Sequence, residues 1–284
     1  MVGNKEVTAE VTPEGGSEKG RRLEVEIISS GRELLIGKTV NTNAAWLASR
    51  VTEIGASVTR VVMVGDSVRE ISGAIVEALG RKPGAIITTG GLGPTYDDMT
   101  VEALASALRV PKVLNEDALR LVSAKYSGMG LPMAPQRIKM AYLPVGAVPI
   151  RNEVGTAPGV AAEFRGASIF CLPGVPSEMK AMFDSSVLPA LSKRSGVVYG
   201  ERTLLVEKIP ESTLASAIDE VRRLHPNVYF KSHPKGSEAL PVIEMHLSAY
   251  APDTGALSRV LDSAEDGFIS AASRIGALVR RRES

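Results

Sequence analysis

Residues 85–98 read AIITTGGLGPTYDD, and this stretch decides the fold class. Its first five residues are apolar or β-branched, which is typical of a strand buried inside a parallel sheet. Three glycines and then two aspartates follow. A helix is expected over about residues 99–108, because Val101, Leu104 and Leu108 recur on one helical face. A buried strand, a glycine turn and a helix in this order indicate an α/β domain.

Strands and helices alternate on both sides of this stretch. Strands are expected at about residues 23–29, 58–64, 85–89, 160–164 and 168–172. Helices are expected at about residues 42–54, 67–80, 99–108, 116–126 and 178–191. This alternation predicts a doubly wound, three-layer α/β domain over residues 22–192, with ligands bound at the strand ends.

The remaining segments predict a tail and a second, smaller domain. Residues 1–21 are polar and charged, so a disordered tail is expected there. Residues 193–200 are polar and contain glycine, as linkers do. Beyond them, the pattern strand, helix, strand, strand, helix predicts a small α+β domain over residues 200–280, either ferredoxin-like or KH-like. The arginines at 280–282 are interpreted as a short basic tail.

The composition excludes several classes of protein. A length of 284 residues suggests about two domains. Lys and Arg total 33 against 32 for Asp and Glu, and this net charge of +1 argues against a nucleic-acid partner. The single cysteine, Cys171, excludes an intrachain disulfide, and its apolar surroundings in the sequence predict a buried thiol. No apolar run is long enough for a signal peptide or a membrane helix, so we expect a cytoplasmic protein with no membrane partner.

The glycine turn formed by Gly90, Gly91 and Gly93 is the strongest chemical signal. Glycines let the backbone approach a ligand closely, and several N–H groups of such a turn can point at one anion. The N-terminus of the following helix adds partial positive charge, so a phosphate or pyrophosphate is the expected ligand. The spacing matches neither a Walker A loop nor a Rossmann fingerprint, and a plain glycine turn is the alternative.

Asp97 and Asp98 follow the glycine turn directly. Adjacent carboxylates beside a phosphate loop suit a hard divalent cation such as Mg²⁺, which proteins usually hold with one or two carboxylates and with phosphate oxygens. The alternative is that Asp98 caps the next helix while Asp97 is solvated.

Three further loops place polar side chains at predicted strand ends. In the first loop, Glu33 can hold a water molecule or act as a base. Asn41 and Asn43 can bind a ribose, a base edge or a phosphate, with helix capping as the alternative. The other two loops contain Asn152, Gly155 and Thr156, and Gly174, Ser177 and Glu178. For the last loop, an ordinary helix entry with proline in the first turn is the alternative. Several polar loops in one domain favour a shared pocket.

Five motifs occur together in this chain. They are GRELLIG at 31–37, NTNA at 41–44, TGGLGPT at 89–95 with the two aspartates after it, NEVGTAPG at 152–159 and LPGVPSEM at 172–179. In this order they resemble the N-terminal domain of the CinA family. That domain belongs to the molybdenum-cofactor-biosynthesis superfamily, together with the MogA, MoaB and MoeA domains. The resemblance covers about residues 23–192 and implies a molybdopterin-binding-like fold.

The resemblance also implies a function. It implies binding of a nucleotide or pterin phosphate and, in CinA-type members, metal-dependent hydrolysis of ADP-ribose-like pyrophosphates. Carried over residue by residue, the motifs imply a phosphate loop at Gly90, Gly91 and Gly93, metal-proximal acids at Asp97 and Asp98, a further acid at Glu33, and ligand contacts at Thr95, Ser177 and Glu178. The nicotinamide-mononucleotide deamidase domain of full-length CinA proteins has no counterpart in these 284 residues, so deamidase activity is not expected.

Two positions depart from the family pattern. Related sequences usually read Gly-Asp-Glu-Leu where this chain has Arg32, and Asp-Thr-Asn where it has Asn41. Two carboxylates near the expected metal are therefore missing. Their loss weakens metal binding or catalysis, or Arg32 binds a phosphate directly.

Three functions remain open at this point. The first is a pyrophosphatase that uses Mg²⁺, Mn²⁺ or Co²⁺ and acts on ADP-ribose or a related diphosphate, with Asp97, Asp98 and Glu33 as catalytic residues. The second is a molybdopterin-binding or adenylyl-transfer protein. The third is a nucleotide sensor without catalysis. The smaller domain has no GXXG loop and a balanced charge, so no RNA partner is expected. The trimeric habit of related domains suggests a homo-oligomer.

Overall fold

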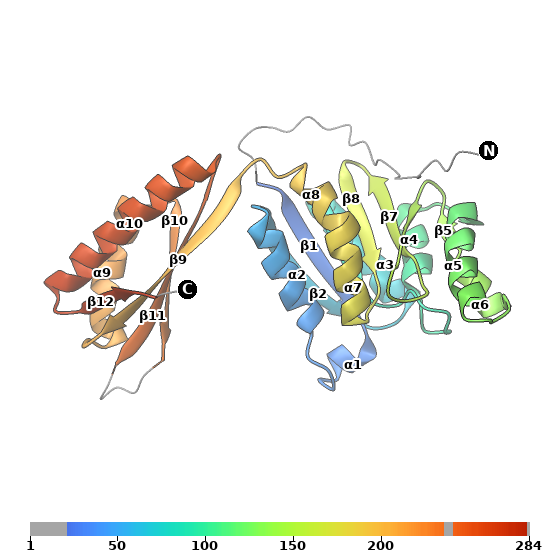
Figure 1. The fold of residues 1–284 in the computed structure, drawn as a ribbon, viewed down its shortest axis with the longest axis horizontal. Coiled ribbons are helices and arrows are strands. Elements are labelled where there is room, and N and C mark those ends of the chain that lie inside the picture. Colours follow the sequence, from blue (N-terminus) through green and yellow to red (C-terminus); the bar gives the residue numbers. More distant parts are fainter. Residues whose placement is uncertain (1–21, 236–240, 283–284) are drawn as a thin grey trace. The chain divides into compact units, whose positions relative to one another are not determined.

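A computed structural model describes residues 22–235 and 241–282 (Figure 1). The tail predicted at residues 1–21 lies outside the described residues. Contacts divide the chain into two units. The first is formed mainly by Arg22–Thr52 and Ala56–Ser195, and the second mainly by Gly196–Ser284. In the part of the chain that the structure covers, no helix combines the length and apolar character needed to cross a membrane.

A six-stranded sheet forms the centre of the first unit. Its strands, in spatial order, are β2 (Ser57–Val64), β1 (Glu24–Ser30), β3 (Ala85–Thr89), β8 (Ala167–Leu172), β7 (Gly159–Phe164) and β6 (Val148–Ile150). The first four are parallel to one another, whereas β7 is antiparallel to both β8 and β6. Val160 at the start of β7 pairs with Cys171 near the end of β8. The loop that enters β7 therefore lies at the same sheet edge as the loops that leave β1, β3 and β8.

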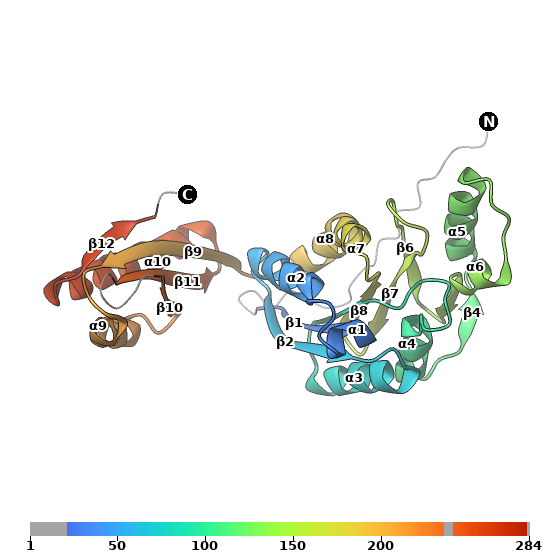
Figure 2. The same ribbon diagram turned by 90° about the horizontal axis from the view of Figure 1, so that it is seen from below.

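Helices cover both faces of this sheet. The helices of the unit are α1 (Arg32–Leu35), α2 (Thr42–Glu53), α3 (Val68–Arg81), α4 (Thr100–Leu108), α5 (Glu116–Gly128), α6 (Pro135–Lys139), α7 (Pro176–Met182) and α8 (Leu188–Ser192). Figure 2 shows α2, α7 and α8 on one face and α3 and α4 on the other. A short ladder of β4 (Lys112–Leu114) and β5 (Tyr142–Pro144) joins the segments before α5 and after α6. This three-layer arrangement confirms the predicted α/β class.

Local signals account for most element boundaries. Ser67 caps α3 by accepting from the N–H of Glu70, as the sequence pattern predicts. One prediction is wrong in detail, because the helix expected to reach residue 191 is interrupted by a π-helical turn at Phe183–Val187. Pro189 follows this turn and has no N–H to donate to the carbonyl four residues earlier, so a regular α-helix cannot continue through it.

A buried ion pair links the central sheet to α3. The side chain of Glu26 on β1 is 3% exposed, and the guanidinium of Arg81 donates two hydrogen bonds of 2.7 Å to its carboxylate. Around this pair, one face of the sheet packs a core of aliphatic side chains that includes Ile28, Ile86 and Leu104. On the other face, Trp46 of α2 packs edge-on against Phe183, with ring centroids 5.4 Å apart.

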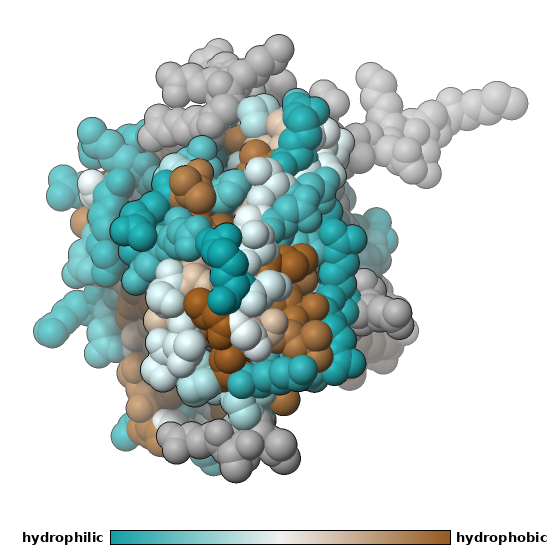
Figure 3. Space-filling view, turned by 90° about the vertical axis from the view of Figure 1, so that its left-hand side faces the viewer, coloured by the Kyte–Doolittle hydropathy of each residue, from teal (hydrophilic) through white to brown (hydrophobic). Residues whose placement is uncertain are grey.

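The second unit is a four-stranded antiparallel sheet with two helices. Its elements are β9 (Val198–Glu207), α9 (Glu211–Leu224), β10 (Val228–Pro234), β11 (Val242–Ala251), α10 (Thr254–Arg274) and β12 (Leu278–Arg281). The spatial strand order β10-β11-β9-β12 is that of the split βαβ or ferredoxin-like arrangement, rather than the KH-like alternative. Figure 3 shows one face of this unit, on which apolar residues lie among hydrophilic ones.

The end of the second unit corrects one expectation. The predicted basic tail at residues 280–282 largely belongs to β12, which pairs with β9. Arg281 pairs with Glu265, a carboxylate of α10 that is 1% exposed. Val279 packs against the core of the unit. A charge partner and an apolar contact therefore turn an arginine-rich segment into an edge strand.

Candidate functional site

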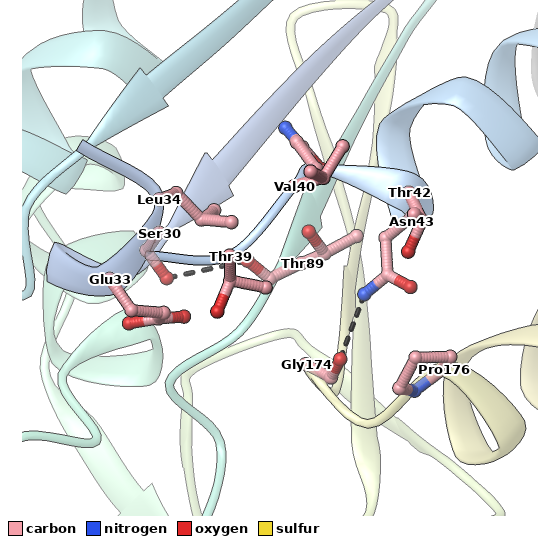
Figure 4. Close-up of a pocket in the computed structure, with 11 residues that line it drawn as sticks. Ser30, Glu33, Leu34, Thr39, Val40, Thr42, Asn43, Thr89, Gly174 and Pro176 are labelled. Atoms are coloured by element: carbon pink, nitrogen blue, oxygen red, sulfur yellow. Dashed lines mark hydrogen bonds between the residues drawn. The ribbon is translucent and has the colours of Figure 1, made fainter. Parts of the chain in front are cut away.

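A cavity of about 130 Å³ opens at the ends of β1 and β3 (Figure 4). Its walls come from the segment between β1 and α2, from the end of β3 and from the loop before α7. The lining residues are Ser30, Glu33, Leu34, Thr39, Val40, Asn41, Thr42, Asn43, Thr89, Gly174 and Pro176. This first cavity therefore brings together Glu33, Asn41, Asn43 and Gly174, four of the predicted site residues.

The two asparagines of the first cavity bind protein groups. The side-chain oxygen of Asn41 accepts from the N–H of Ala44, so the capping alternative holds for Asn41. Its amide group donates to the hydroxyl of Ser29 over 3.0 Å. The side-chain amide of Asn43 donates to the carbonyl of Gly174 over 2.8 Å. Both residues thus fix the walls of the cavity, and their contact with a ligand stays a prediction.

Glu33 and its neighbour Arg32 occupy different places. Glu33 is exposed at the first cavity, and its carboxylate lies over Gly31 so closely that a Cβ at that glycine would clash with it. The backbone N–H of Arg32 donates to the carboxylate of Asp66 over 2.8 Å. Arg32 is not among the residues that line the first cavity. Glu33 is therefore the acidic side chain of this loop that a ligand can meet.

The glycine turn is shaped by contacts inside the protein. Gly90 and Gly91 have φ angles of +105° and +65°, a region that favours glycine. A Cβ at Gly90 would collide with the carbonyl oxygen of Ser30, and one at Gly91 would lie 2.5 Å from the hydroxyl of Thr100. The N–H of Gly90 donates to the carbonyl of Leu172 over 3.0 Å. The first two glycines therefore allow β1, β3, β8 and α4 to meet at one point.

After Gly90, the glycine turn has backbone N–H groups that can donate to a ligand. Within residues 22–235 and 241–282, the backbone N–H groups of Gly91, Leu92 and Gly93 have no protein acceptor. Pro94 has no N–H to contribute. Successive unpaired N–H groups in a turn form a concave site for an anion. The geometry of the glycine turn therefore suits an anion, and the binding of a phosphate there stays a prediction.

Thr95, Asp97 and Asp98 form a closed turn after the glycines. The N–H and hydroxyl of Thr95 lie 2.8 and 2.6 Å from the same carboxylate oxygen of Asp98, and the hydroxyl also contacts the carboxylate of Asp97. The hydrogen bond from Thr95, followed by the backbone N–H of Asp97 itself, lowers the pKa of Asp97. The alternative that Asp98 caps α4 is wrong, because the residue before that helix is Met99 and Asp98 closes the turn instead.

Few side chains among the described residues are placed to coordinate a metal ion. Across the described ranges, no group of three or more His, Cys, Asp and Glu side chains is arranged to hold a metal ion. The carboxylates of Asp97 and Asp98 are adjacent, and the lowered pKa keeps Asp97 ionised. Two carboxylates fit a divalent cation that takes its other ligands from water and from phosphate oxygens, as Mg²⁺ commonly does.

Lys139 is a site residue that the sequence analysis missed. Its ammonium group, at the end of α6, donates to the carbonyls of Thr95 and Asp98 over 2.5 and 3.0 Å. Together with Gly91, Gly93 and Asp98 it lines a second cavity of about 250 Å³. The segment around Lys139 carries only proline and glycine punctuation in the sequence, and no local pattern links it to a turn 41 residues away.

The loop before β7 meets the start of α7. The side-chain amide of Asn152 donates to Glu178 over 2.6 Å and to the carbonyl of Ala157 over 2.9 Å, and its oxygen accepts from the N–H groups of Val154 and Gly155. Asn152 is 4% exposed, so its hydrogen-bonding capacity is used within the protein. A Cβ at Gly155 would clash with the carboxylate of Glu178. These residues organise the loop.

The remaining predicted residues lie around this loop. Asn152 and Thr156 line a third cavity of about 620 Å³ beside α5. Gly174 lines the first cavity and also lies close to the glycine turn, because a Cβ on it would lie 3.5 Å from the Cα of Gly90. Ser177 is exposed in the first turn of α7. The predicted residues therefore share one sheet edge, where nine of them line three separate cavities. The other six do not line these cavities: Gly90, Thr95, Asp97, Gly155, Ser177 and Glu178.

Cys171 lies below this edge and takes no part in the site. The thiol is buried in β8, and burial raises its pKa to about 11. A thiol that is neutral and shielded is a poor nucleophile. The predicted buried thiol is confirmed.

The family described as "Probable molybdopterin binding domain" matches residues 26–193. The chain belongs to this molybdopterin-binding domain family. A protein of Pyrobaculum calidifontis is 48% identical over 240 residues, which cover 84% of this chain and 91% of that protein. A protein of Aeropyrum pernix is 50% identical over 228 residues, which cover 79% and 84% of the two chains.

A solved structure places the molybdopterin-binding domain within the CinA branch. The crystal structure of the protein CinA from Thermoplasma acidophilum, described as of unknown function, is 40% identical in sequence. It superposes with a TM-score of 0.56 and covers 59% of this chain and 98% of that chain. The resemblance to the CinA N-terminal domain is thereby confirmed.

Proposed function

We propose that the molybdopterin-binding domain binds ADP-ribose or a related diphosphate and hydrolyses its pyrophosphate bond with the help of a divalent cation. The observation that supports this proposal is the turn at residues 91–98. There the unpaired N–H groups of Gly91 and Gly93 adjoin the carboxylates of Asp97 and Asp98. A Cβ at Gly93 would lie only 2.6 Å from an oxygen of Asp98, which shows how close donors and acids are.

The two kinds of group suit the two parts of a metal-bound diphosphate. Backbone N–H groups donate to phosphate oxygens without the desolvation cost of a charged side chain. Asp97 and Asp98 would hold Mg²⁺, Mn²⁺ or Co²⁺, which when bound neutralises phosphate charge and favours ionisation of water. In the reaction, one water molecule adds its oxygen to a phosphorus atom, and the bridging oxygen leaves with the other phosphate. ADP-ribose would yield AMP and ribose 5-phosphate.

The first cavity would hold the organic part of the ligand. Its polar wall presents the hydroxyl of Thr89 and the side chains of Asn41 and Asn43, which fits a ribose or a heterocycle edge. Glu33 is an exposed acid that lines this cavity, and in the proposed reaction it would accept a proton from water. Lys139, Asn152 and Glu178 hold the surrounding loops in place.

Two other functions have specific support. The family description favours a pterin phosphate as ligand, bound by the same loops, with adenylyl transfer as a possible reaction class. A nucleotide sensor without catalysis is supported by Arg32 and Asn41, which stand where the family pattern has acids. Asn41 caps α2, so its side chain serves the fold in any of these functions.

The decisive experiment measures AMP release from ADP-ribose with and without Mg²⁺, Mn²⁺ or Co²⁺. We expect metal-dependent AMP from the full chain and its loss in Asp98→Asn. Asp219→Asn serves as a control, because Asp219 is exposed on α9 in the second unit. Equal thermal midpoints would show that both variants fold.

A negative result separates the alternatives. If ADP-ribose binds but no metal produces AMP, hydrolysis is excluded and the sensor function gains support. If only a pterin phosphate binds, the molybdopterin function replaces the proposal. We further propose that the protein acts in the cytoplasm as a homo-oligomer, and light scattering of the purified chain tests the assembly state.

A further inference from the structure

We call residues 95–98 the acid turn, and the ammonium group of Lys139 bridges its two ends. Lys139 donates hydrogen bonds of 2.5 and 3.0 Å to the carbonyls of Thr95 and Asp98. These two residues lie on either side of Asp97 in the sequence. Lys139 comes from α6, a separate element 41 residues further along the chain. A cationic side chain from a separate element therefore holds the turn from outside.

The electronegative atoms of the turn favour a cation at this place. Two carbonyl oxygens and two carboxylates lie within a segment of four residues, and all of them are electronegative. An ammonium group has three donors and can satisfy two carbonyls at once. Among the described residues, no other side chain donates to the carbonyls of Thr95 or Asp98. Without Lys139, water would have to replace both hydrogen bonds.

We infer that Lys139 is a positioning residue, which fixes the acid turn in the shape that presents Asp97 and Asp98 to the cation and the diphosphate. This inference rests on the proposed function. Its structural part, the hold of Lys139 on the turn, is testable without any substrate. Lys139 itself is not required to touch the ligand.

Three variants isolate the hydrogen bonds from the charge. Lys139→Met keeps the length and apolar stem but removes the donors, whereas Lys139→Arg keeps donors and charge. Lys112→Met removes a second lysine that lines the same cavity. Lys112 pairs with Glu102 and makes no hydrogen bond to the acid turn.

The first measurement is amide hydrogen exchange at residues 95–98 in the free protein. We expect exchange roughly tenfold faster in Lys139→Met, the size of effect that follows from losing hydrogen bonds to a charged donor. Lys139→Arg and Lys112→Met should exchange as the unmodified chain does. Unchanged exchange in Lys139→Met would overturn the inference.

The second measurement is steady-state AMP release from ADP-ribose. A positioning role predicts that Lys139→Met lowers kcat by roughly tenfold, leaves KM within about twofold, and is largely rescued in Lys139→Arg. An equal loss in Lys112→Met would mean that only local positive charge matters, which overturns the inference. If the unmodified chain releases no AMP but Lys139→Met still exchanges faster, the proposed function fails while the hold of Lys139 on the turn stands.

Discussion

The side-chain amide of Asn43 donates a hydrogen bond of 2.8 Å to the carbonyl oxygen of Gly174, across 131 residues of sequence. This bond joins the start of α2 to the loop before α7 and closes one wall of the first cavity (Figure 4). Asn43 is 9% exposed, and in the described part of the chain its side-chain oxygen has no hydrogen-bond partner. The amide group is therefore oriented by Gly174 alone.

Replacing Asn43 with aspartate should open this wall of the cavity. A carboxylate cannot donate to the carbonyl of Gly174 and would leave it facing a negative charge, so we expect a loss of about 1–3 kcal/mol in the free energy of unfolding. Urea denaturation of Asn43→Asp measures the loss. Asn227→Asp, at an exposed position of the second unit, is the matched control. Equal effects of the two substitutions would contradict a special role for this bond.

Substitutions at Gly90 and Gly37 allow the stability cost of a strained φ angle to be measured apart from the cost of steric crowding. Both have positive φ angles, but a Cβ at Gly37 meets no atom within 4 Å, whereas one at Gly90 collides with Ser30. Gly37→Ala should cost about 1 kcal/mol of stability through its φ angle. Gly90→Ala should cost roughly 3 kcal/mol, because overpacking is added to the same strain. Similar losses in both variants would show that the contact with Ser30 is easily relaxed.

The ion pair of Glu26 and Arg81 should be costly to break from one side. Arg81→Met leaves the buried carboxylate of Glu26 without its partner, and we expect a loss in the free energy of unfolding that is clearly larger than in an exposed control pair. Solvent reaches the Arg81 side chain, which is 35% exposed, so the loss should be smaller than for a pair whose two members are both buried. Arg120→Met breaks an exposed pair with Asp117 and should change stability by less than about 1 kcal/mol. A loss in Arg81→Met no larger than in this control would refute the prediction.

Thr95→Val should raise the pKa of Asp97, because the hydrogen bond from Thr95 is the largest cause of its lowered value. A carboxylate with a lowered folded-state pKa stabilises the fold above its unfolded-state pKa, and this contribution disappears as the pH falls through the folded-state value. In Thr95→Val the contribution should therefore be lost at a higher pH. Carbon-detected NMR titration of the Asp97 carboxyl group follows the shift directly. Thr213→Val, on α9, should leave the titration unchanged.

Cys171 provides a probe of unfolding in the first unit. The buried thiol has a pKa of about 11, so at pH 8 it is neutral and shielded, and we expect no reaction with a thiol reagent in the folded state. Addition of denaturant should expose one reactive thiol per chain, since the sequence contains one cysteine. The reaction rate against denaturant concentration measures the opening of β8. Rapid labelling without denaturant would contradict the burial.

Much of the first unit was predictable because its signals are local. The apolar run at residues 85–89, the glycines and the helical spacing that follows lie next to one another, and together they specify β3, the turn and α4. The sequence predicts β7 only as the partner of β8 in a hairpin. Its consequence, that the loop of Asn152 joins the other loops, depends on the register of the whole sheet.

The misses have a common physical cause. The hold of Lys139 on the acid turn and the pairing of Arg281 with Glu265 are contacts between distant segments, and each side chain alone looks like an ordinary solvated charge. The same holds for Asn152, whose polar character suggests ligand binding until its four partners are known. The sequence showed which loops are chemically rich, whereas tertiary contacts decide which side chains remain free for a ligand.

The edge strand β12 also makes the second unit sensitive to truncation. A premature stop codon before residue 278 would remove the strand that covers β9 and the arginine nearest to the buried carboxylate of Glu265, leaving Arg202 at 3.8 Å. The uncovered strand would then offer free backbone groups to any neighbouring chain. We expect such truncated products to aggregate or to be degraded in the cell, so that the short strand β12 governs the abundance of the protein.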